Sequence, residues 1–244
     1  MGSSCGDFSL IRRDHDAMDE LAIFAKYWQP GQVKTRLGVE IGMNSSSAIY
    51  RQFVVTLLDR LQTEADQRIL AFAPTQYHRD FEQLPGASNW QLTPQSSGDL
   101  GERMSQFFRQ RFQAGASRVV LIGSDSPSLP LPYIRDAFQQ LHTHDAVFGP
   151  SVDGGYYLVG MRKPLEFLFE GIEWSTENVW RQTLQRIRSN SVEIALAVLP
   201  QWYDVDTLTE LKRLVDELDH SASDSHETRV LSQLCHELLN DREA

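Results

Sequence analysis

The sequence has no long apolar run and little cysteine. None of its 244 residues falls in a stretch of 18 or more apolar residues, so no segment has the length needed to span a bilayer. The first twenty residues are polar and mixed in charge, without the apolar stretch of a secretory signal. The 2 cysteines, Cys5 and Cys235, lack ligand-like or C-x-x-C spacing, which argues against a disulfide framework and a zinc site. We therefore expect a cytoplasmic protein without membrane insertion.

Positive charge is also scarce. The chain has 23 Lys and Arg residues against 33 Asp and Glu residues, a formal net charge of −10. Because neutralising duplex phosphates requires a basic face, we expect no nucleic-acid partner. The acidity is uneven, since residues 216–244 hold eight acids and two bases, a net charge of −6, and leave −4 for the rest. The body is close to neutral and has room for a small cationic pocket.

The length favours a single domain with one hydrophobic core. The polar start predicts a disordered lead-in over residues 1–19, followed by the folded domain over 20–219. We expect an acidic C-terminal tail over 220–244, which begins with the linker-like stretch 220–226 and contains a short helix.

Apolar runs alternate with stretches of helical spacing. Strands are predicted at 21–25, 69–73, 91–93, 119–123, 146–149, 156–160 and 194–199. Helices are predicted at 44–61, 76–84, 100–114, 132–141, 175–188 and from 207, where Thr207 and Glu210 form a capping box. This alternation predicts an α/β fold, a mostly parallel central sheet with helices on both faces. Ligands of such sheets bind beyond the carboxyl ends of the strands, so the loops there are the candidate site.

The loop after the first strand, FAKYWQPGQVKTRL at 24–37, carries three cations. Lys26 and Lys34 offer point charges and Arg36 a bidentate fork, which suits an anionic ligand such as a phosphate chain. A solvated loop is the alternative. The loop is not a Walker A motif, because Trp28 and Val33 occupy the positions of the required glycines.

Acidic residues follow two of the predicted strands. Asp125 comes directly after the VVLIG run, and Asp204 and Asp206 come after the last strand. Carboxylates at strand ends are well placed to hold Mg²⁺ or Mn²⁺ against phosphate oxygens. Capping of the next turn or helix explains each of them equally simply.

Three further segments have a weaker pattern. In QSSGDLGERM at 95–104, a helix N-terminus, two glycines and Arg103 favour an anion, although a plain helix start explains most of it. The glycine-rich DGGYY at 153–157 can shape a sugar or alcohol pocket, and a structural hairpin is the more frequent explanation. Trp174 in EWST, 173–176, either fixes a helix entry or lines an acceptor side.

Taken in this order, the segments resemble a bacterial family. The motifs are FAK followed by P-x-x-VKTRL, GDLGERM, GSDSP, DGGYYLVG, WST and DVDT. Together they are similar to the glycosyltransferase-like proteins described as radical-SAM/selenodomain-associated transferases. These belong to the nucleotide-diphospho-sugar transferase superfamily, which has the GT-A fold, a Rossmann-like single domain. The resemblance covers about 21–218, and between Lys26 and Pro30 this chain is one residue longer than the family pattern.

The resemblance implies a role for each segment. Lys34 and Arg36 would contact the phosphates of a nucleotide, and with Asp125 they form the expected catalytic set. The nucleotide site as a whole is expected to comprise Ala25, Lys26, Lys34, Arg36, Gly98, Asp99, Arg103 and Ser124. Asp125 would ligate Mg²⁺ or Mn²⁺ together with Asp206, or with Asp204 as the alternative. The acceptor or sugar is expected at Asp153, Gly154, Gly155, Tyr156 and Trp174.

The superfamily contains two chemistries. Nucleotidyltransferases usually carry a G-x-G-x-R loop where this chain has the single Gly31, and glycosyltransferases usually carry D-x-D where it has Asp125-Ser126-Pro127. We expect a metal-dependent transferase that takes a nucleotide-sugar donor and a small-molecule acceptor. The alternatives are a nucleotidyltransferase that joins a nucleoside triphosphate to a phosphorylated small molecule with pyrophosphate release, and a non-catalytic nucleotide-binding protein.

Overall fold

Seven strands form the central sheet. They are β1 (Asp19–Lys26), β2 (Gln67–Ala73), β3 (Gln91–Pro94), β4 (Arg118–Ile122), β5 (Ala146–Pro150), β6 (Tyr156–Met161) and β7 (Leu196–Val198). The computed structural model describes residues 17–189, 191, 193–220 and 225–240. Most of the expected lead-in, residues 1–16, including Cys5, lies outside the described residues.

The strand order is β3-β2-β1-β4-β6-β5-β7. All neighbouring pairs are parallel except those of β6, which runs antiparallel to both β4 and β5. The chain passes from β1 outward to β2 and β3 and then returns to the other side of β1 to form β4. The crevice between β1 and β4 is therefore the topological switch point of the sheet.

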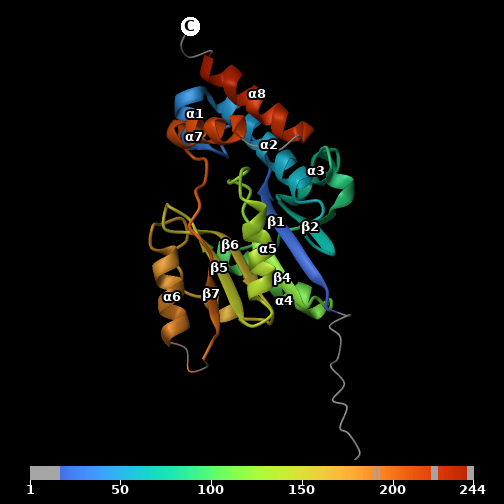
Figure 1. The fold of residues 1–244 in the computed structure, drawn as a ribbon, viewed down its shortest axis with the longest axis vertical. Coiled ribbons are helices and arrows are strands. Elements are labelled where there is room, and N and C mark those ends of the chain that lie inside the picture. Colours follow the sequence, from blue (N-terminus) through green and yellow to red (C-terminus); the bar gives the residue numbers. More distant parts are fainter. Residues whose placement is uncertain (1–16, 190, 192, 221–224, 241–244) are drawn as a thin grey trace, which may run out of the picture.

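Helices and short 3-10 turns connect the strands. The helices are α1 (Thr35–Ile41), α2 (Met43–Arg60), α3 (His78–Glu82), α4 (Leu100–Gln113), α5 (Leu131–Gln140), α6 (Val179–Ser189), α7 (Leu208–Asp219) and α8 (His226–Asn240). The 3-10 turns are η1 (Thr75–Tyr77), η2 (Ala87–Asn89) and η3 (Glu166–Phe169). Figure 1 shows α1, α7 and α8 gathered at the end of the molecule toward which β1 runs. No helix in the described ranges is both long enough and apolar enough to cross a membrane.

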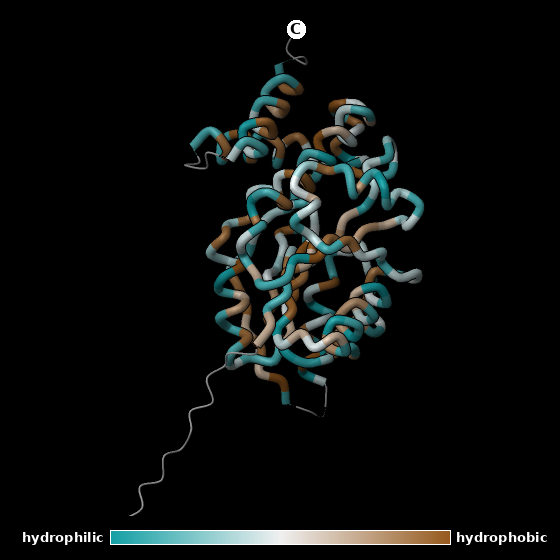
Figure 2. Tube along the Cα trace, turned by 90° about the vertical axis from the view of Figure 1, so that its right-hand side faces the viewer, coloured by the Kyte–Doolittle hydropathy of each residue, from teal (hydrophilic) through white to brown (hydrophobic). Residues whose placement is uncertain are grey.

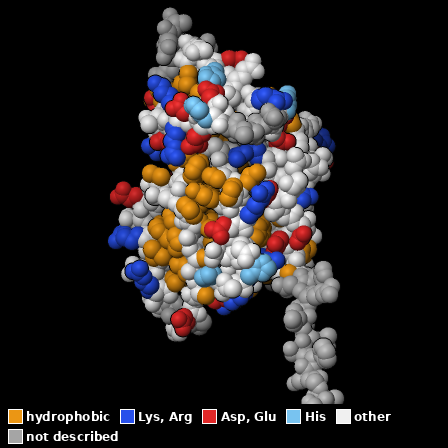
Figure 3. All heavy atoms as spheres, in the orientation of Figure 1, with side chains coloured by type: hydrophobic (Ala, Val, Ile, Leu, Met, Phe, Trp, Pro, Cys, Tyr) orange, Lys and Arg blue, Asp and Glu red, His pale blue; other side chains and the backbone are white. Residues whose placement is uncertain are grey.

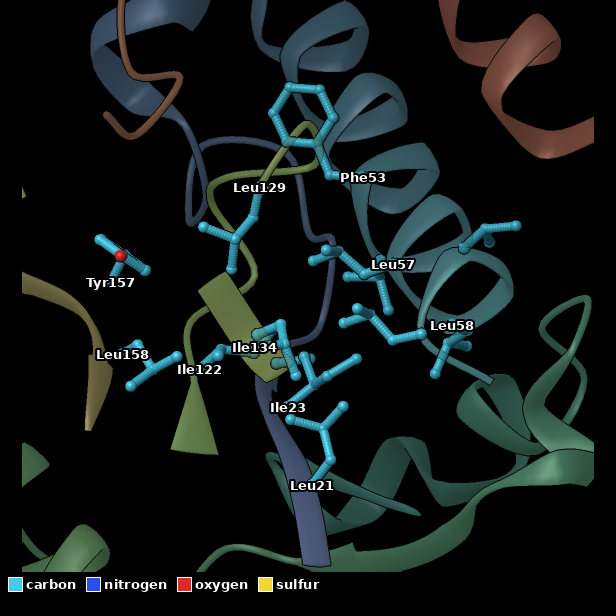
Figure 4. Close-up of a cluster of buried hydrophobic side chains, with 14 of the residues drawn as sticks. Leu21, Ile23, Phe53, Leu57, Leu58, Ile122, Leu129, Ile134, Tyr157 and Leu158 are labelled. Atoms are coloured by element: carbon cyan, nitrogen blue, oxygen red, sulfur yellow. The ribbon is translucent and has the colours of Figure 1, made fainter. Parts of the chain in front are cut away.

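The two faces of the sheet carry separate apolar clusters because successive side chains of a strand point to opposite sides. Leu21 and Ile23 of β1 belong to one cluster with buried residues of α2. In Figure 4, Leu57 and Leu58 of α2 lie toward Ile23, and Phe53 lies farther along the helix beside Leu129. The alternate residue Ala22 packs in the second cluster, which includes buried side chains of α4 and η3. In Figure 2, hydrophobic segments lie largely in the interior of the molecule, and hydrophilic segments lie largely on the outer turns. The predicted α/β sheet covered on both faces is confirmed.

Three local elements differ from the sequence-based prediction. Helix α1 occupies part of what the sequence suggested was loop, and it begins after Lys34, whose backbone is left-handed at φ 47° and ψ 41°. The helix expected from Ser175 begins at Val179. The strand expected at 194–199 is confined to β7.

The C-terminal helix α8 belongs to the same core. It packs against α2, and its Leu231 and Cys235 are fully buried. Burial raises the pKa of the Cys235 thiol to about 12, with a smaller contribution from the charge of Asp219, so this thiol is unreactive. On the face shown in Figure 3, apolar side chains gather in the middle, and charged ones concentrate around the end that carries α7 and α8.

Candidate functional site

A cavity of about 560 Å³ lies at the switch point, beyond the carboxyl ends of β1 and β4. The loop after β1 contributes Lys26 and residues 32–36, and the turn after β4 contributes Ser124 and Asp125. Ten residues that the sequence analysis assigned to the site line this cavity: Ala25, Lys26, Lys34, Arg36, Arg103, Ser124, Asp125, Tyr156, Asp206 and its alternative Asp204. The fold thus brings together residues that are up to 181 positions apart in the sequence.

The loop after β1 is held by aromatic packing outside the cavity. Tyr27 stacks on Tyr77 with ring centroids 3.5 Å apart, and Trp28 packs edge-on against Phe81 at 5.0 Å. The extra residue that the family resemblance implies between Lys26 and Pro30 would fall in this packed segment. Lys26 still lines the cavity.

Lys34 lies between two carboxylates. Its side chain is only 2% exposed, and its ammonium nitrogen contacts Asp125 Oδ1 and donates to Asp206 Oδ1 at 2.8 Å. Arg36 Nη1 is 3.9 Å from Asp206 Oδ2, and the Arg36 side chain is 70% exposed. The two cations therefore have different environments. Lys34 is buried and paired with two carboxylates, whereas Arg36 is exposed at the opening of the cavity.

These contacts set the ionisation of the pair. Burial by itself would lower the pKa of Lys34, but the charges and hydrogen bonds of Asp125 and Asp206 outweigh it and hold the pKa above its ordinary value. Burial would likewise raise the pKa of Asp206, but Lys34, with a smaller contribution from Arg36, lowers it. At neutral pH both partners are therefore charged.

Asp204 differs from Asp206 in its surroundings. Ser126 Oγ donates to Asp204 Oδ1 at 2.6 Å, and Lys34 makes no hydrogen bond to it. Burial is the largest cause that raises the Asp204 pKa, to about 7, and the negative charge of Asp125 adds to it. The sequence left both acids open as the second metal ligand. In the structure, Asp206 and Asp125 both contact Lys34, and Asp204 lies close enough to Asp125 for its negative charge to raise the Asp204 pKa.

Arg103 is held from behind by residues of its own segment. Its Nε donates to the Asp99 carbonyl at 3.2 Å and its Nη1 to Gln95 Oε1 at 3.0 Å. The Gln95 amide is itself fixed, because Nε2 donates to the carbonyls of Ala25 and Ala71 at 3.2 and 2.8 Å. The guanidinium thus has a defined position at the cavity wall with donors left over for an anion.

Tyr50 of α2 joins the ends of β1 and β4 at the cavity. Its hydroxyl accepts from the Lys26 backbone N–H at 3.0 Å and shares a hydrogen bond with Ser124 Oγ at 2.7 Å. Burial, and then the charge of Asp125, raises the Tyr50 pKa to about 12, so the hydroxyl stays protonated. Tyr50 therefore fixes the backbone of one strand end and a hydroxyl of the other.

Two predicted nucleotide-binding residues do not line the cavity. Asp99 is the N-cap of α4, where its side chain accepts from Glu102 N at 2.9 Å and Glu102 Oε2 accepts from Asp99 N at 2.9 Å. Gly98 precedes it with φ 107°, a conformation that favours glycine. Both residues build the helix start that carries Arg103.

The residues predicted for an acceptor or sugar are divided. Tyr156 lines the cavity, whereas Asp153, Gly154, Gly155 and Trp174 do not. Asp153 Oδ1 accepts from Gly155 N at 3.1 Å, which closes the turn before β6.

Gly154 and Trp174 are closely packed against other parts of the chain. A Cβ on Gly154 would lie 2.2 Å from the Glu177 carbonyl oxygen, and a Cβ on Gly101 would lie 2.6 Å from Trp174 Nε1. The turn is thus packed against Glu177 at Gly154, and Trp174 is packed against Gly101.

Tyr157, the second tyrosine of the predicted DGGYY segment, also lines the cavity. Several lining residues were not among the predicted site residues, including Tyr50, Gln95, Leu100, Gly123 and Ser175. Tyr50 has no sequence signal, because it lies in the apolar pattern of α2. Ser175 lies in the WST segment and has φ 64°, a left-handed backbone in a residue with a side chain, which is uncommon outside functional sites.

The side chains are compatible with a divalent cation only in part. Carboxylate oxygens are the ligands that Mg²⁺ and Mn²⁺ prefer. Within the described ranges, no group of three or more His, Cys, Asp and Glu side chains is arranged to hold a metal ion. Two carboxylates match the way Mg²⁺ binds in nucleotide sites, where phosphates and water complete its shell. The position between Asp125 and Asp206 is, however, taken by the ammonium of Lys34.

The sequence matches one protein-family model over residues 56–176, the family described as "Uncharacterized protein conserved in bacteria (DUF2064)". No curated protein matches the sequence.

Three solved structures illustrate the range of similarity. A protein from Desulfovibrio desulfuricans G20 described as a "putative nucleotide-diphospho-sugar transferase" is 32% identical, covers 92% of this chain and 98% of its own, and has a TM-score of 0.83. A nucleotidyl transferase from Methanothermobacter thermautotroptrophicus is 12% identical over 82% of this chain and 97% of its own, with a TM-score of 0.55. A Mycobacterium tuberculosis H37Rv protein solved in complex with manganese is 15% identical over 82% and 99%, with a TM-score of 0.51. The last two similarities concern the fold alone.

Proposed function

The chain belongs to the DUF2064 family of nucleotide-diphospho-sugar transferase-like proteins, and from this premise we propose that it is a metal-dependent transferase that uses a nucleotide-sugar donor and a small-molecule acceptor. The observation that carries the proposal is the convergence of Arg36, Arg103, Lys26 and Asp125 on one cavity at the switch point. Its volume of about 560 Å³ lies within the usual range for small-molecule sites.

The cations of the cavity would bind the diphosphate. Arg36 is the best placed of these cations to bind phosphate. Its side chain is 70% exposed, and its Nη1 is 3.9 Å from Oδ2 of Asp206, one of the two carboxylates that contact Lys34. Arg103 approaches from the opposite segment with its orientation fixed by Gln95. Ser124 and the backbone of Ala25 would line the nucleoside side, where Tyr50 orients the Ser124 hydroxyl.

Asp125 with Asp206, or with Asp204, would hold Mg²⁺ or Mn²⁺, which when bound supplies positive charge to the phosphates of the leaving nucleotide. The acceptor or sugar would lie against Tyr156, Tyr157 and Ser175. Trp174 packs edge-on against Tyr156 of that wall, with ring centroids 6.3 Å apart. Removing one charged contact to the leaving group is expected to cost about 3 kcal/mol, or about 100-fold in rate.

Nucleotidyl transfer is the alternative reaction. It is favoured by the residue two positions after Asp125, which is Pro127 rather than the second acid of a D-x-D motif. In that case, the same cations would neutralise an α-phosphate attacked by an acceptor phosphate, and pyrophosphate would leave. A protein that binds nucleotide without consuming it is the alternative of another class.

A thermal-shift panel tests the proposal. Nucleoside triphosphates and nucleotide-sugars are each added with and without Mn²⁺, since a tight ligand raises the melting temperature by mass action. We expect stabilisation that needs both metal and nucleotide. Arg36→Gln should lose it, whereas Arg135→Gln, which removes a cation paired with Glu64 outside the cavity, should keep it.

Phosphorus NMR of the ligand that stabilises best then separates the reactions. Release of nucleoside diphosphate indicates glycosyl transfer, release of pyrophosphate indicates nucleotidyl transfer, and an unchanged spectrum with every acceptor class indicates binding alone. Stabilisation by no nucleotide, or by a nucleotide-sugar equally well without metal, contradicts the proposal.

A further inference from the structure

The ammonium of Lys34 occupies the position between the two carboxylates that the proposed function assigns to a cation. We propose that Lys34 is a built-in counter-ion of Asp125 and Asp206, which opposes metal binding to the protein alone and is exchanged for the metal when an anionic ligand enters. The inference rests on the proposed function for the identity of that ligand, a nucleotide diphosphate or triphosphate. It adds to the proposed function that Lys34 must leave the two carboxylates before the metal can bind to both of them.

The geometry shows how firmly Lys34 is held. Its side chain is 2% exposed, its nitrogen engages both carboxylates, and the same nitrogen is 5.9 Å from the centre of the Phe53 ring. Its backbone is fixed as well, since its carbonyl accepts from Gly38 N at 2.7 Å in the first turn of α1. Only the flexible four-carbon stem of the side chain is free to change.

The carboxylates, in contrast, face the cavity. Asp125 and Asp206 are 45% and 36% exposed, so each is accessible to an ion from solvent on the side that Lys34 does not cover. A divalent cation and an ammonium cannot occupy the same gap, because like charges at such distances repel strongly in a partly buried site. Binding of the metal to both acids therefore requires Lys34 to leave.

An anionic ligand changes this balance by offering Lys34 another partner. Lys34 and Arg36 flank the same carboxylate from two sides, so phosphates bound by Arg36 arrive close to the ammonium. Once Lys34 turns to a phosphate oxygen, the carboxylate pair has no counter-ion and its affinity for a divalent cation rises. By linkage, metal and phosphate ligand then raise each other's affinity, and part of that coupling is carried by Lys34.

The test measures metal binding to the protein without any nucleotide. Free Mn²⁺ is measured by electron paramagnetic resonance during titration of the wild type, Lys34→Gln, Lys34→Met and Lys163→Gln. Lys163 is the matched control, because it also loses an ion pair, 3.1 Å from Asp145, but lies outside the cavity. We expect at least tenfold tighter Mn²⁺ binding by both Lys34 variants and less than a twofold change for Lys163→Gln. Unchanged or weaker binding by folded Lys34 variants would overturn the inference.

A second measurement needs no variant and so stays decisive if the Lys34 variants fail to fold. Lysines of the wild type are acetylated briefly and their labelling is quantified by mass spectrometry. Lys34 should react much more slowly than the exposed Lys26, and saturating Mn²⁺ should raise the Lys34 rate at least tenfold with little change at Lys26. Bound Mn²⁺ with no change at Lys34 would also overturn the inference.

Failure of this inference is distinguishable from failure of the proposed function. Neither measurement contains nucleotide, so both report on the exchange of cations alone. A protein that binds nucleotide in the thermal-shift panel but shows no exchange at Lys34 refutes only the counter-ion role.

Discussion

Tyr50→Phe tests whether the Tyr50 hydroxyl positions the groups that bind the nucleotide as well as stabilising the fold. It keeps the ring that packs in the core and removes one oxygen, which accepts from Lys26 N at 3.0 Å and shares a hydrogen bond with Ser124 Oγ at 2.7 Å. Tyr50 is 3% exposed, so water cannot replace the lost partners without rearrangement. The substitution therefore acts on both strand ends that form the cavity.

The size of the effect follows from these two contacts. A net contribution of about 1 kcal/mol for each hydrogen bond predicts a loss of about 2 kcal/mol in the free energy of unfolding. For a chain of this length, that lowers the melting temperature by about 4–8 °C. If Ser124 contacts the nucleotide, the loss of its orientation should weaken nucleotide binding by about fivefold, which corresponds to about 1 kcal/mol.

Tyr203→Phe is the matched control. Tyr203 is also 3% exposed, and its hydroxyl donates to Glu217 Oε2 at 2.7 Å and shares a longer hydrogen bond with Ser128 Oγ at 3.3 Å, but it does not line the cavity. Urea denaturation should show a similar loss for both variants, and calorimetric titration should show weaker nucleotide binding only for Tyr50→Phe. Equal nucleotide affinities in the two variants would refute the positioning role of Tyr50, and an unchanged urea midpoint would refute the energetic estimate.

Three further predictions concern other charged groups. Asp125→Ala should abolish metal-dependent turnover, and an unchanged rate at saturating Mn²⁺ would remove Asp125 from the site. Burial, and then the charge of Asp125, raises the Asp204 pKa to about 7, against about 3.9 in an unfolded chain. Between these two pH values the native state binds more protons than the unfolded state. The contribution of Asp204 to the free energy of unfolding therefore falls as the pH rises from about 4 to about 7. Asp204→Asn should therefore gain stability relative to the wild type between pH 4 and 7 in urea midpoints, and a difference that does not vary with pH argues against the shift. Glu20 is fully buried and accepts from Arg111 Nε and Nη2 at 2.6 and 2.7 Å, so Glu20→Gln should cost about 3–5 kcal/mol in urea denaturation. Glu166→Gln, which loses a half-exposed pair with Arg109, should cost less than about 1 kcal/mol, and equal costs would contradict the argument from burial.

Local patterns in the sequence were sufficient for the fold class. The strands at 119–123 and 156–160 are predictable because continuous apolar runs between turn residues have few other uses in a chain of this size. The capping box of Thr207 and Glu210 is present as predicted, since both of its hydrogen bonds form within four residues. Helix α1 was missed because it follows a left-handed Lys34 and has no side-chain cap.

The sequence predicted only those residues of the candidate site that belong to a recognisable local motif. Lys34 and Arg36 lie in the loop that follows the apolar strand β1, Asp125 lies in the turn after β4, and all three line one cavity. Tyr50 could not be found in this way, because in sequence it is one more residue of the apolar side of α2. The acidic end of the chain likewise gave no sign that Leu231 and Cys235 complete the core.

The sequence alone thus determined which residues carry charge at the ends of strands, because strand, turn and helix are set by neighbours within a few positions. Only the tertiary structure decided which of those charges meet. Asp125 and Asp206 are 81 residues apart. The crossing of the chain from β3 to β4 places Asp125 beside β1, and the segment after β7 returns to it, where Val205 N donates to the Asp125 carbonyl at 2.9 Å, so that both acids meet Lys34. A lysine expected to face phosphates is therefore paired with carboxylates, since burial of an ammonium requires a counter-charge at the place where the fold puts it.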